Sequence, residues 1–115
     1  MMTLSEKQKK FTLLIARLIL WSYSKGYELT FGEAYRTPEQ AALNAKSGKG
    51  ISNSLHIQRL AVDMNLFVKG EYKSNSSDYK PLGDYWKTLD PECCWGGDFS
   101  KPDGNHFSIT FNGVK

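Results

Sequence analysis

A single carboxylate inside an apolar strand constrains this chain more than any other feature of its sequence. Residues 60–67 read Leu-Ala-Val-Asp-Met-Asn-Leu-Phe, a pattern typical of a buried β-strand with Asp63 near its middle. An ionised carboxylate in such a place is costly unless it has a hydrogen-bonded partner or a metal ion. Asp63 is therefore either a structural anchor or a metal ligand, and this segment alone favours neither.

Both histidines of the chain can approach Asp63. His56 precedes it by seven residues, across a segment that can fold back as a turn. His106 opens a second predicted strand, 107–111, whose alternation leaves the imidazole on the polar face. Two imidazoles and one carboxylate form a sound ligand set for a catalytic zinc ion, with the fourth position open to water.

A metal-dependent hydrolase also needs a carboxylate that takes a proton from the attacking water and returns it to the leaving amine. Asp103 lies three residues before His106, with Gly104 allowing a tight approach, and is the candidate. Asp98 is the rival, but its place in a glycine turn predicts a structural carboxylate that accepts hydrogen bonds from backbone amides. The His-Glu-x-x-His helix of many zinc peptidases is absent from the sequence.

The adjacent Cys93 and Cys94 offer a rival chemistry, with a thiol as nucleophile and His106 as base. This alternative leaves His56 and Asp63 without a role, and no pattern places either thiol at a helix N-terminus, where its pKa would fall. A vicinal pair seldom closes a disulfide, because the bond and the peptide between the two residues would be strained. We expect two reduced thiols outside the site, in a protein made in the cytosol.

Hydrophobic spacing predicts one α+β domain that spans residues 1–115. The expected helices cover 5–25, with Ser5 as N-cap and Gly26 as the stop, then 39–46, with Thr37 as cap and Pro38 in the first turn, and 82–89. The expected strands cover 27–35, 60–67 and 107–111, and 71–78 reads as a polar surface excursion. Trp95 and Phe99 are either cleft walls or core residues.

Composition excludes several classes of protein. Hydrophobic residues make up 40% of the chain and charged residues 23%, which excludes a disordered chain, a fibre or a coiled coil. The net charge of +3 is too small to indicate a nucleic-acid partner. The apolar run from Phe11 to Trp21 is interrupted by Arg17, is too short to span a bilayer and precedes no small-residue cleavage site. We therefore expect a packed amphipathic helix and no stable membrane insertion.

Three segments, in this order, resemble the M15 zinc peptidases, which include D-Ala-D-Ala carboxypeptidases and dipeptidases and the phage L-alanyl-D-glutamate endopeptidases. Residues 34–40, Ala-Tyr-Arg-Thr-Pro-Glu-Gln, are similar to an upstream segment with an arginine and a helix start. Residues 54–63, Ser-Leu-His-Ile-Gln-Arg-Leu-Ala-Val-Asp, are similar to the motif S-x-H-x-x-G-x-A-x-D. Residues 95–99, Trp-Gly-Gly-Asp-Phe, followed by Asp103-x-x-His106, are similar to the second half of the endolysin signature. Arg59 departs from the pattern, which usually has glycine there.

The resemblance implies a fold and a metal site. The fold is a small antiparallel sheet flanked by helices, of the Hedgehog/DD-peptidase-like kind. One Zn²⁺ per chain is then bound by His56, Asp63 and His106, with Asp103 as the general base.

Two further residues gain a role from the resemblance. Arg36 would lie at the substrate end of the site, where a guanidinium binds a carboxylate or the developing oxyanion. Without the resemblance, a cap or an ion pair with Glu33 or Glu39 is the better interpretation of Arg36. Ser54 would orient His56 or bind substrate, and would otherwise be a capping residue.

The functional hypothesis is a zinc peptidase that cuts peptidoglycan stem peptides at the L-alanyl-D-glutamate bond. We expect a monomeric endolysin, made in the bacterial host cytoplasm without a signal peptide and active on the wall after release. One alternative is a D-Ala-D-Ala carboxypeptidase or dipeptidase. The other is a non-catalytic relative that only binds cell-wall peptide or holds zinc structurally.

Overall fold

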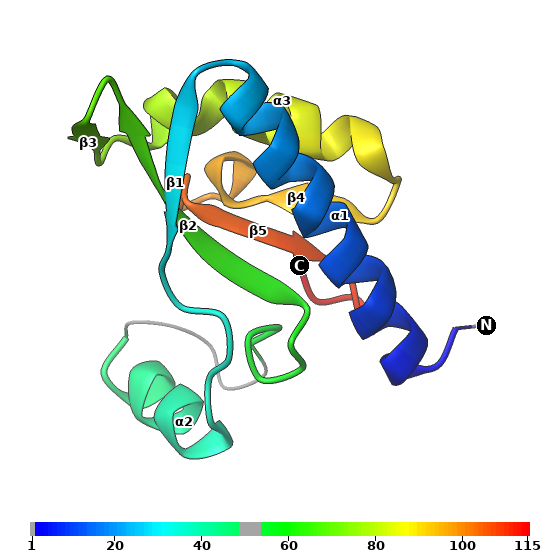
Figure 1. Cartoon of the computed structure of the whole chain (residues 1–115). Coiled ribbons are helices and arrows are strands. Elements are labelled where there is room, and N and C mark those ends of the chain that lie inside the picture. The colour runs from blue at the N-terminus through cyan, green and yellow to red at the C-terminus, as the bar shows by residue number, and fades with distance from the viewer. Residues whose placement is uncertain (1, 49–53) are drawn as a thin grey trace.

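Alternating helical and strand-like segments build a mixed α+β fold (Figure 1). The structure is a computed structural model that describes residues 2–48 and 54–115. Its helices are α1 (Leu4–Ser24), α2 (Pro38–Lys46) and α3 (Lys80–Leu89), with 3₁₀ turns η1 (Ser76–Tyr79) and η2 (Gly96–Asp98). Its strands are β1 (Tyr27–Phe31), β2 (Ala61–Val68), β3 (Glu71–Lys73), β4 (Cys93–Trp95) and β5 (His106–Ile109).

The sheet is antiparallel throughout and is organised around β2, as predicted for the buried strand at 60–67. The strand order is β1-β2-β5-β4, and β3 also pairs with β2. The first residues of β2 pair with β5, where Asp63 lies opposite His106. The second half pairs with β1, where Leu66 lies opposite Leu29. This register puts the Asp63 carboxylate and the His106 imidazole side by side in the middle of the sheet. The small antiparallel sheet and its flanking helices confirm the predicted α+β fold class.

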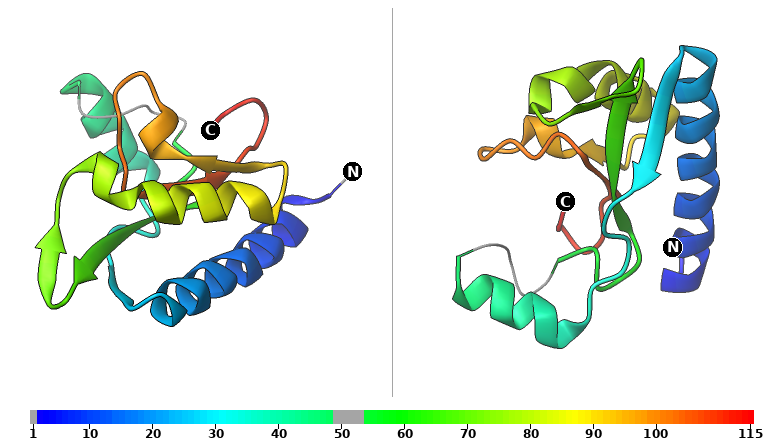
Figure 2. Two further views of the ribbon diagram at one scale, coloured as in Figure 1. Left: turned by 90° about the horizontal axis from the view of Figure 1, so that it is seen from above. Right: turned by 60° about the vertical axis from the view of Figure 1, so that its left-hand side comes forward.

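The hydrophobic core lies where α1 and α3 meet the sheet. Leu18 of α1, Trp86 of α3 and Phe107 of β5 are all fully buried. The Trp86 ring contacts Phe11 and Phe107 edge-on, with ring centroids 5.9 and 6.1 Å apart. Such aromatic pairs contribute packing energy beyond simple burial. The helix α2 stands apart from this core, as the two views of Figure 2 show.

The start of α1 differs from the prediction. Thr3, and not Ser5, is the N-cap: its hydroxyl accepts from the Glu6 amide at 3.2 Å, and the Glu6 carboxylate accepts from the Thr3 amide at 2.8 Å. This reciprocal pair satisfies two amides that the first turn leaves free, whereas Ser5 already lies inside the helix. The predicted stop is confirmed, because Gly26 follows the helix with a φ of +85°.

The other predicted elements are present with shifted ends. Thr37 caps α2 as expected, accepting from the Gln40 amide at 3.1 Å. β1 ends at Phe31 and does not reach residue 35, although two backbone hydrogen bonds continue its contact with β2: the Gly32 amide donates to the Asp63 carbonyl at 2.7 Å, and the Asp63 amide donates to the Glu33 carbonyl at 2.8 Å. The three-residue strand β4 was not predicted, and it exists through its pairing with β5. Among the described residues, none of the helices combines the length and apolar character needed to cross a bilayer.

A charge network joins α1 to the segment around β4. Lys7 donates to Glu92 at 2.6 Å and to the Thr110 carbonyl at 2.7 Å. Lys10 contacts Asp90 at 2.8 Å and Glu92 at 3.2 Å. The hydrogen bond from Lys7 lowers the pKa of Glu92. Burial raises the pKa of Asp90, but the contacts with Lys10, the Glu92 amide and Lys7 together outweigh burial and lower it.

These lowered pKa values predict acid-sensitive stability. A carboxylate with a lowered pKa in the folded state stabilises the fold above its unfolded pKa, about 4.3 for Glu, and this contribution is lost as the pH falls. We expect Glu92→Gln to reduce the free energy of unfolding by about 1 kcal/mol at pH 7 and by much less at pH 3. Urea unfolding at both pH values measures this, with Glu71→Gln as the exposed control. An equal loss at both pH values would contradict the prediction.

Candidate metal centre and active site

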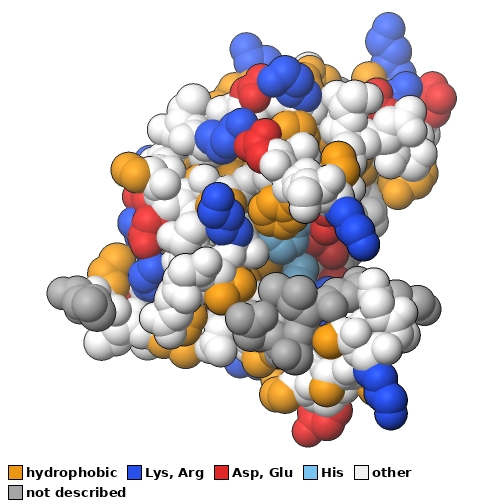
Figure 3. Space-filling view, turned by 180° about the vertical axis from the view of Figure 1, so that it is seen from behind, with side chains coloured by type: hydrophobic (Ala, Val, Ile, Leu, Met, Phe, Trp, Pro, Cys, Tyr) orange, Lys and Arg blue, Asp and Glu red, His pale blue; other side chains and the backbone are white. Residues whose placement is uncertain are grey.

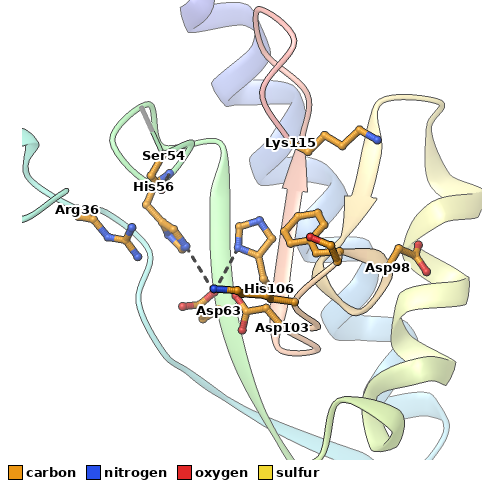
Figure 4. Close-up of a pocket in the computed structure, with 11 residues that line it drawn as sticks. Arg36, Ser54, His56, Asp63, Asp98, Asp103, His106 and Lys115 are labelled. Carbon is orange, nitrogen blue, oxygen red and sulfur yellow. Dashed lines mark hydrogen bonds and ion pairs between the residues drawn. The ribbon is translucent and has the colours of Figure 1, made fainter. Parts of the chain in front are cut away.

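His56, Asp63 and His106 form one cluster (Figure 4). The Oδ1 atom of Asp63 lies 3.4 Å from Nε2 of His56 and 3.6 Å from Nδ1 of His106. One ligand atom of each residue lies within 4.8 Å of the others. Asp63 and His106 meet because β2 and β5 pair in that register, and His56 enters from the turn before β2. The convergence expected from the sequence is therefore present.

The turn that carries His56 is tight, and its backbone conformation at Arg59 is one that glycine usually adopts. Backbone hydrogen bonds from Gln58 and Leu60 to the Leu55 carbonyl, at 3.1 and 3.0 Å, close it. Arg59 has a φ of +57°, in the left-handed region that glycine occupies most easily. Its guanidinium lies over the Tyr35 ring at 4.2 Å from the centroid, a cation–π contact that offsets part of the backbone cost. Arginine therefore replaces the family glycine with the glycine-like backbone conformation kept.

Two neighbours fix the orientation of His56, which is 3% exposed. The Ser54 hydroxyl accepts from its backbone amide at 3.2 Å. The ring Nδ1 lies 3.2 Å from the Ala34 carbonyl oxygen. A hydrogen bond from Nδ1 to that oxygen leaves Nε2 facing Asp63 with a free lone pair. Ser54 thus orients the segment of His56, one of the two roles expected for it, and it also lines the cleft.

The cluster fits a zinc ion. Oδ1 of Asp63 and Nε2 of His106 are buried and have no hydrogen-bond partner among the described residues. Burial opposes ionisation of Asp63, but the two facing imidazoles outweigh it and lower the pKa of Asp63 to about 2. Burial lowers the pKa of His56, and the carboxylate of Asp63 more than reverses this effect. An ionised carboxylate between two imidazoles is a ligand set typical of zinc.

A cleft of about 620 Å³ opens over the cluster. Figure 3 shows the histidines at the bottom of this hollow, with acidic and basic side chains near them. Besides the cluster, the cleft is lined by Arg36, Ser54, Asp98, Phe99, Ser100, Lys101, Asp103 and Lys115. Phe99 is a cleft wall, with its ring centroid 5.3 Å from that of His106. Trp95 is instead 6% exposed and belongs to the core.

The two aspartates considered for proton transfer lie in different surroundings. Burial raises the pKa of Asp103, and the nearby Asp63 carboxylate raises it further. Asp98 is more exposed and contacts Lys87 of α3 at 2.7 Å. The structural role predicted for Asp98, accepting hydrogen bonds from backbone amides, was wrong: its partner is a lysine side chain across the surface.

Arg36 forms the ion pair with Glu33 that the sequence predicted, and it also lies beside the cleft. Its Nε donates to Glu33 Oε1 at 3.0 Å, and its Nη2 pairs with the same oxygen. Its backbone amide donates to the His56 carbonyl at 3.2 Å, which places the residue beside the cluster. The guanidinium also lines the cleft. The ion pair with Glu33 therefore holds Arg36 in the cleft and does not remove it from the site.

The C-terminal segment brings a residue to the cleft that the sequence analysis missed. The predicted strand 107–111 ends at Ile109, and Phe111 and Val114 form a small bridge with reciprocal backbone hydrogen bonds of 3.0 and 2.9 Å. The turn between them returns the chain, so that Lys115 lines the cleft. Asn112-Gly113 is a recognised hairpin-turn pair and was the available signal.

The thiols take no part in the site. Cys93 and Cys94 are free, as expected for a vicinal pair. Burial raises the pKa of Cys93 to about 12 and also raises the pKa of Cys94. Neither residue lines the cleft. A protonated thiol away from the histidines is no nucleophile, so this geometry does not support a cysteine peptidase.

A family model described as D-alanyl-D-alanine carboxypeptidase matches residues 47–109, more than half of the chain. The chain belongs to the M15 peptidase family. It is therefore a metallopeptidase of a family that acts on peptidoglycan, and its cofactor is zinc. The family resemblance noted in the sequence is confirmed.

Two solved structures share the fold. The L-Ala D-Glu endopeptidase ChiX of Serratia marcescens is 20% identical, with a TM-score of 0.75 over 90% of this chain and 80% of ChiX. A mutant of the vancomycin-resistance D,D-pentapeptidase VanY from a VanB-type cassette, in complex with Zn(II), is 16% identical, with a TM-score of 0.58 over 87% of this chain and 70% of VanY. These likenesses confirm a DD-peptidase-like fold. No curated protein sequence matches the chain.

Proposed function

We propose that this M15 peptidase hydrolyses the L-alanyl-D-glutamate bond of peptidoglycan stem peptides. His56, Asp63 and His106 bind the zinc ion, and Asp103 is the general base. The observation that carries the proposal is the cluster of three potential metal ligands at the bottom of a cleft that Asp103 also lines. The choice of bond is supported by the fold likeness to the endopeptidase ChiX, whose TM-score exceeds that of VanY.

The protein supplies proton transfer and orientation. Bound zinc provides a Lewis acid that polarises the scissile carbonyl. Asp103 accepts a proton from the attacking water and returns it to the departing amine. Its raised pKa suits this role, because a base whose pKa lies nearer to the working pH both accepts and releases a proton readily.

Positively charged side chains orient the substrate. Arg36 is permanently charged and, held by Glu33, presents its remaining N–H groups to a substrate carboxylate or to the developing oxyanion. Lys101 and Lys115 add positive charge elsewhere along the cleft. This lining favours a peptide that carries carboxylates, as the stem peptide does.

The products of digestion test the choice of bond. We expect zinc-loaded protein, incubated with purified peptidoglycan, to release fragments with a new N-terminal D-glutamate, measured by mass spectrometry. Free D-alanine would instead identify a D-Ala-D-Ala carboxypeptidase, the second candidate, which the family description favours. If the protein binds to the peptidoglycan but releases no fragments, it is a wall-binding relative without activity.

The proposal includes the biological setting of an endolysin. The chain would act as a monomer that is made in the cytoplasm of a bacterial host and acts on the wall after release. Added to isolated walls, the purified protein should lower their turbidity, while its synthesis inside intact cells should leave the culture turbid. Lysis of cells that merely synthesise the chain would contradict this setting.

A further inference from the structure

Both backbone groups of Gly104 are bound by side chains. Its amide donates to the Ser76 hydroxyl at 2.9 Å, and its carbonyl accepts from Nε1 of Trp95 at 2.7 Å. Gly104 lies directly after Asp103 and two residues before His106. Two side chains from separate parts of the fold therefore hold the segment that joins the proposed base to a proposed metal ligand.

Ser76 and Gly104 are in direct contact. A Cβ atom built on Gly104 would lie 2.5 Å from the Cα of Ser76, so no larger residue fits at position 104 without displacing one of the two segments. Ser76 comes from the polar stretch 71–78, whose composition predicts a surface excursion. In the structure this stretch forms β3 and η1 and contacts the active-site segment.

Ser76 is held by a firm support. Tyr79, at the end of η1, is 2% exposed. Its hydroxyl accepts from the Leu66 amide at 3.0 Å and donates to the Lys73 carbonyl at 2.8 Å. These bonds fasten η1 to β2, the strand that carries Asp63. The contact from Ser76 to Gly104 thus connects the strand of one proposed metal ligand to the segment of the proposed base.

Asp103 has room to move if this contact is lost. Its side chain lines the catalytic cleft, and the residue also borders a second pocket of about 210 Å³, lined by Tyr72, Ser74, Ser76 and Asn105 among others. Its backbone amide donates to the Gly96 carbonyl at 2.9 Å, and its carbonyl accepts from the His106 amide at 3.0 Å. These bonds hold the loop to η2 and to the start of β5, and the bonds to Gly104 join the same loop to η1 and to Trp95.

We propose that Ser76 is a positioning residue for Asp103: through the Gly104 amide it keeps the carboxylate in the catalytic cleft and out of the adjacent pocket. Trp95 supports the same glycine from the opposite side. This role rests on the proposed function, because it matters only if Asp103 is the base. Displacing a catalytic group by about 1 Å can cost on the order of 100-fold in rate.

The test uses the zinc-loaded full chain with Ser76→Ala. We expect kcat on a stem-peptide substrate to fall by about 10- to 100-fold, while KM and zinc affinity stay within about twofold. The Gly104 amide should exchange with solvent at least about tenfold faster, as measured by NMR. Ser77→Ala, a neighbouring exposed serine of η1, is the matched control. Ser76→Thr keeps the hydroxyl and should restore most of kcat.

Each readout has a result that overturns the proposal. An unchanged exchange rate of the Gly104 amide in Ser76→Ala would show that the hydrogen bond to Ser76 does not stabilise this segment. Faster exchange with unchanged kcat would show that the contact does not position Asp103. Equal impairment of Ser76→Thr and Ser76→Ala, or a parallel loss of zinc, would indicate a merely structural residue. A zinc-loaded wild type that cuts no wall peptide would overturn the proposed function and this role together, and the exchange data would still tell whether the contact exists.

Discussion

Asp103→Ala should lose peptidase activity by about 100- to 10,000-fold and still bind one zinc ion per chain. The carboxylate of Asp103 lies outside the cluster of three metal donors, so its removal leaves the ligand set complete. Its loss deprives the attacking water of a proton acceptor and the leaving amine of a proton donor. The decisive measurement is kcat/KM on a stem-peptide substrate together with the zinc content of the same sample.

Asp98→Ala is the matched control for this experiment. Asp98 also lines the cleft and is also an aspartate, but it pairs with Lys87 and is about half exposed in its side chain, at 52%. We expect this variant to keep most of its activity, since an exposed ion pair contributes little to stability or to chemistry. The reverse pattern, an active Asp103→Ala and an inactive Asp98→Ala, would mean that Asp98 is the base.

The sequence predicted the metal ligands because the chemistry of a buried carboxylate restricts which residues can lie beside it. A carboxylate in an apolar strand needs partners, and two histidines are the only imidazoles in the chain, so His56 and His106 were the natural candidates for Asp63. Strand alternation gave the face of His106 correctly. Alternation within one strand does not determine the register between two strands. The pairing of β2 with β5 that sets Asp63 opposite His106 was therefore not predictable from either strand alone.

The features that escaped prediction depend on contacts between distant segments. β4 has three residues and no pattern of its own, so only its pairing with β5 makes it a strand. Ser76 reads as a loop serine until its neighbour Gly104, 28 residues later, is placed beside it. These features depend on tertiary contacts, and the sequence of one segment does not show which other segment it contacts.

Asp63→Asn separates the two roles left open for a carboxylate in this strand. The substitution keeps the size of the side chain and removes its charge. Because the pKa of Asp63 is about 2, the wild-type residue is ionised at any pH at which the enzyme would be assayed. A neutral amide oxygen is a weaker zinc ligand than a carboxylate, so we expect less than about a tenth of a zinc ion per chain and a loss of activity of at least about 1,000-fold.

Stability provides an independent measure of the same loss. Zinc that binds only the folded chain stabilises it by RT ln(1 + c/Kd), where c is the free zinc concentration, and so raises the melting temperature. Added zinc should therefore stabilise the wild type and leave Asp63→Asn unchanged. Asn65→Ala, two residues further along β2 and on the same face, is the matched control and should respond as the wild type does. Full zinc binding by Asp63→Asn, with a lower melting temperature in the absence of metal, would make Asp63 a structural anchor for the two histidines. Loss of zinc with an unchanged metal-free melting temperature makes it a ligand.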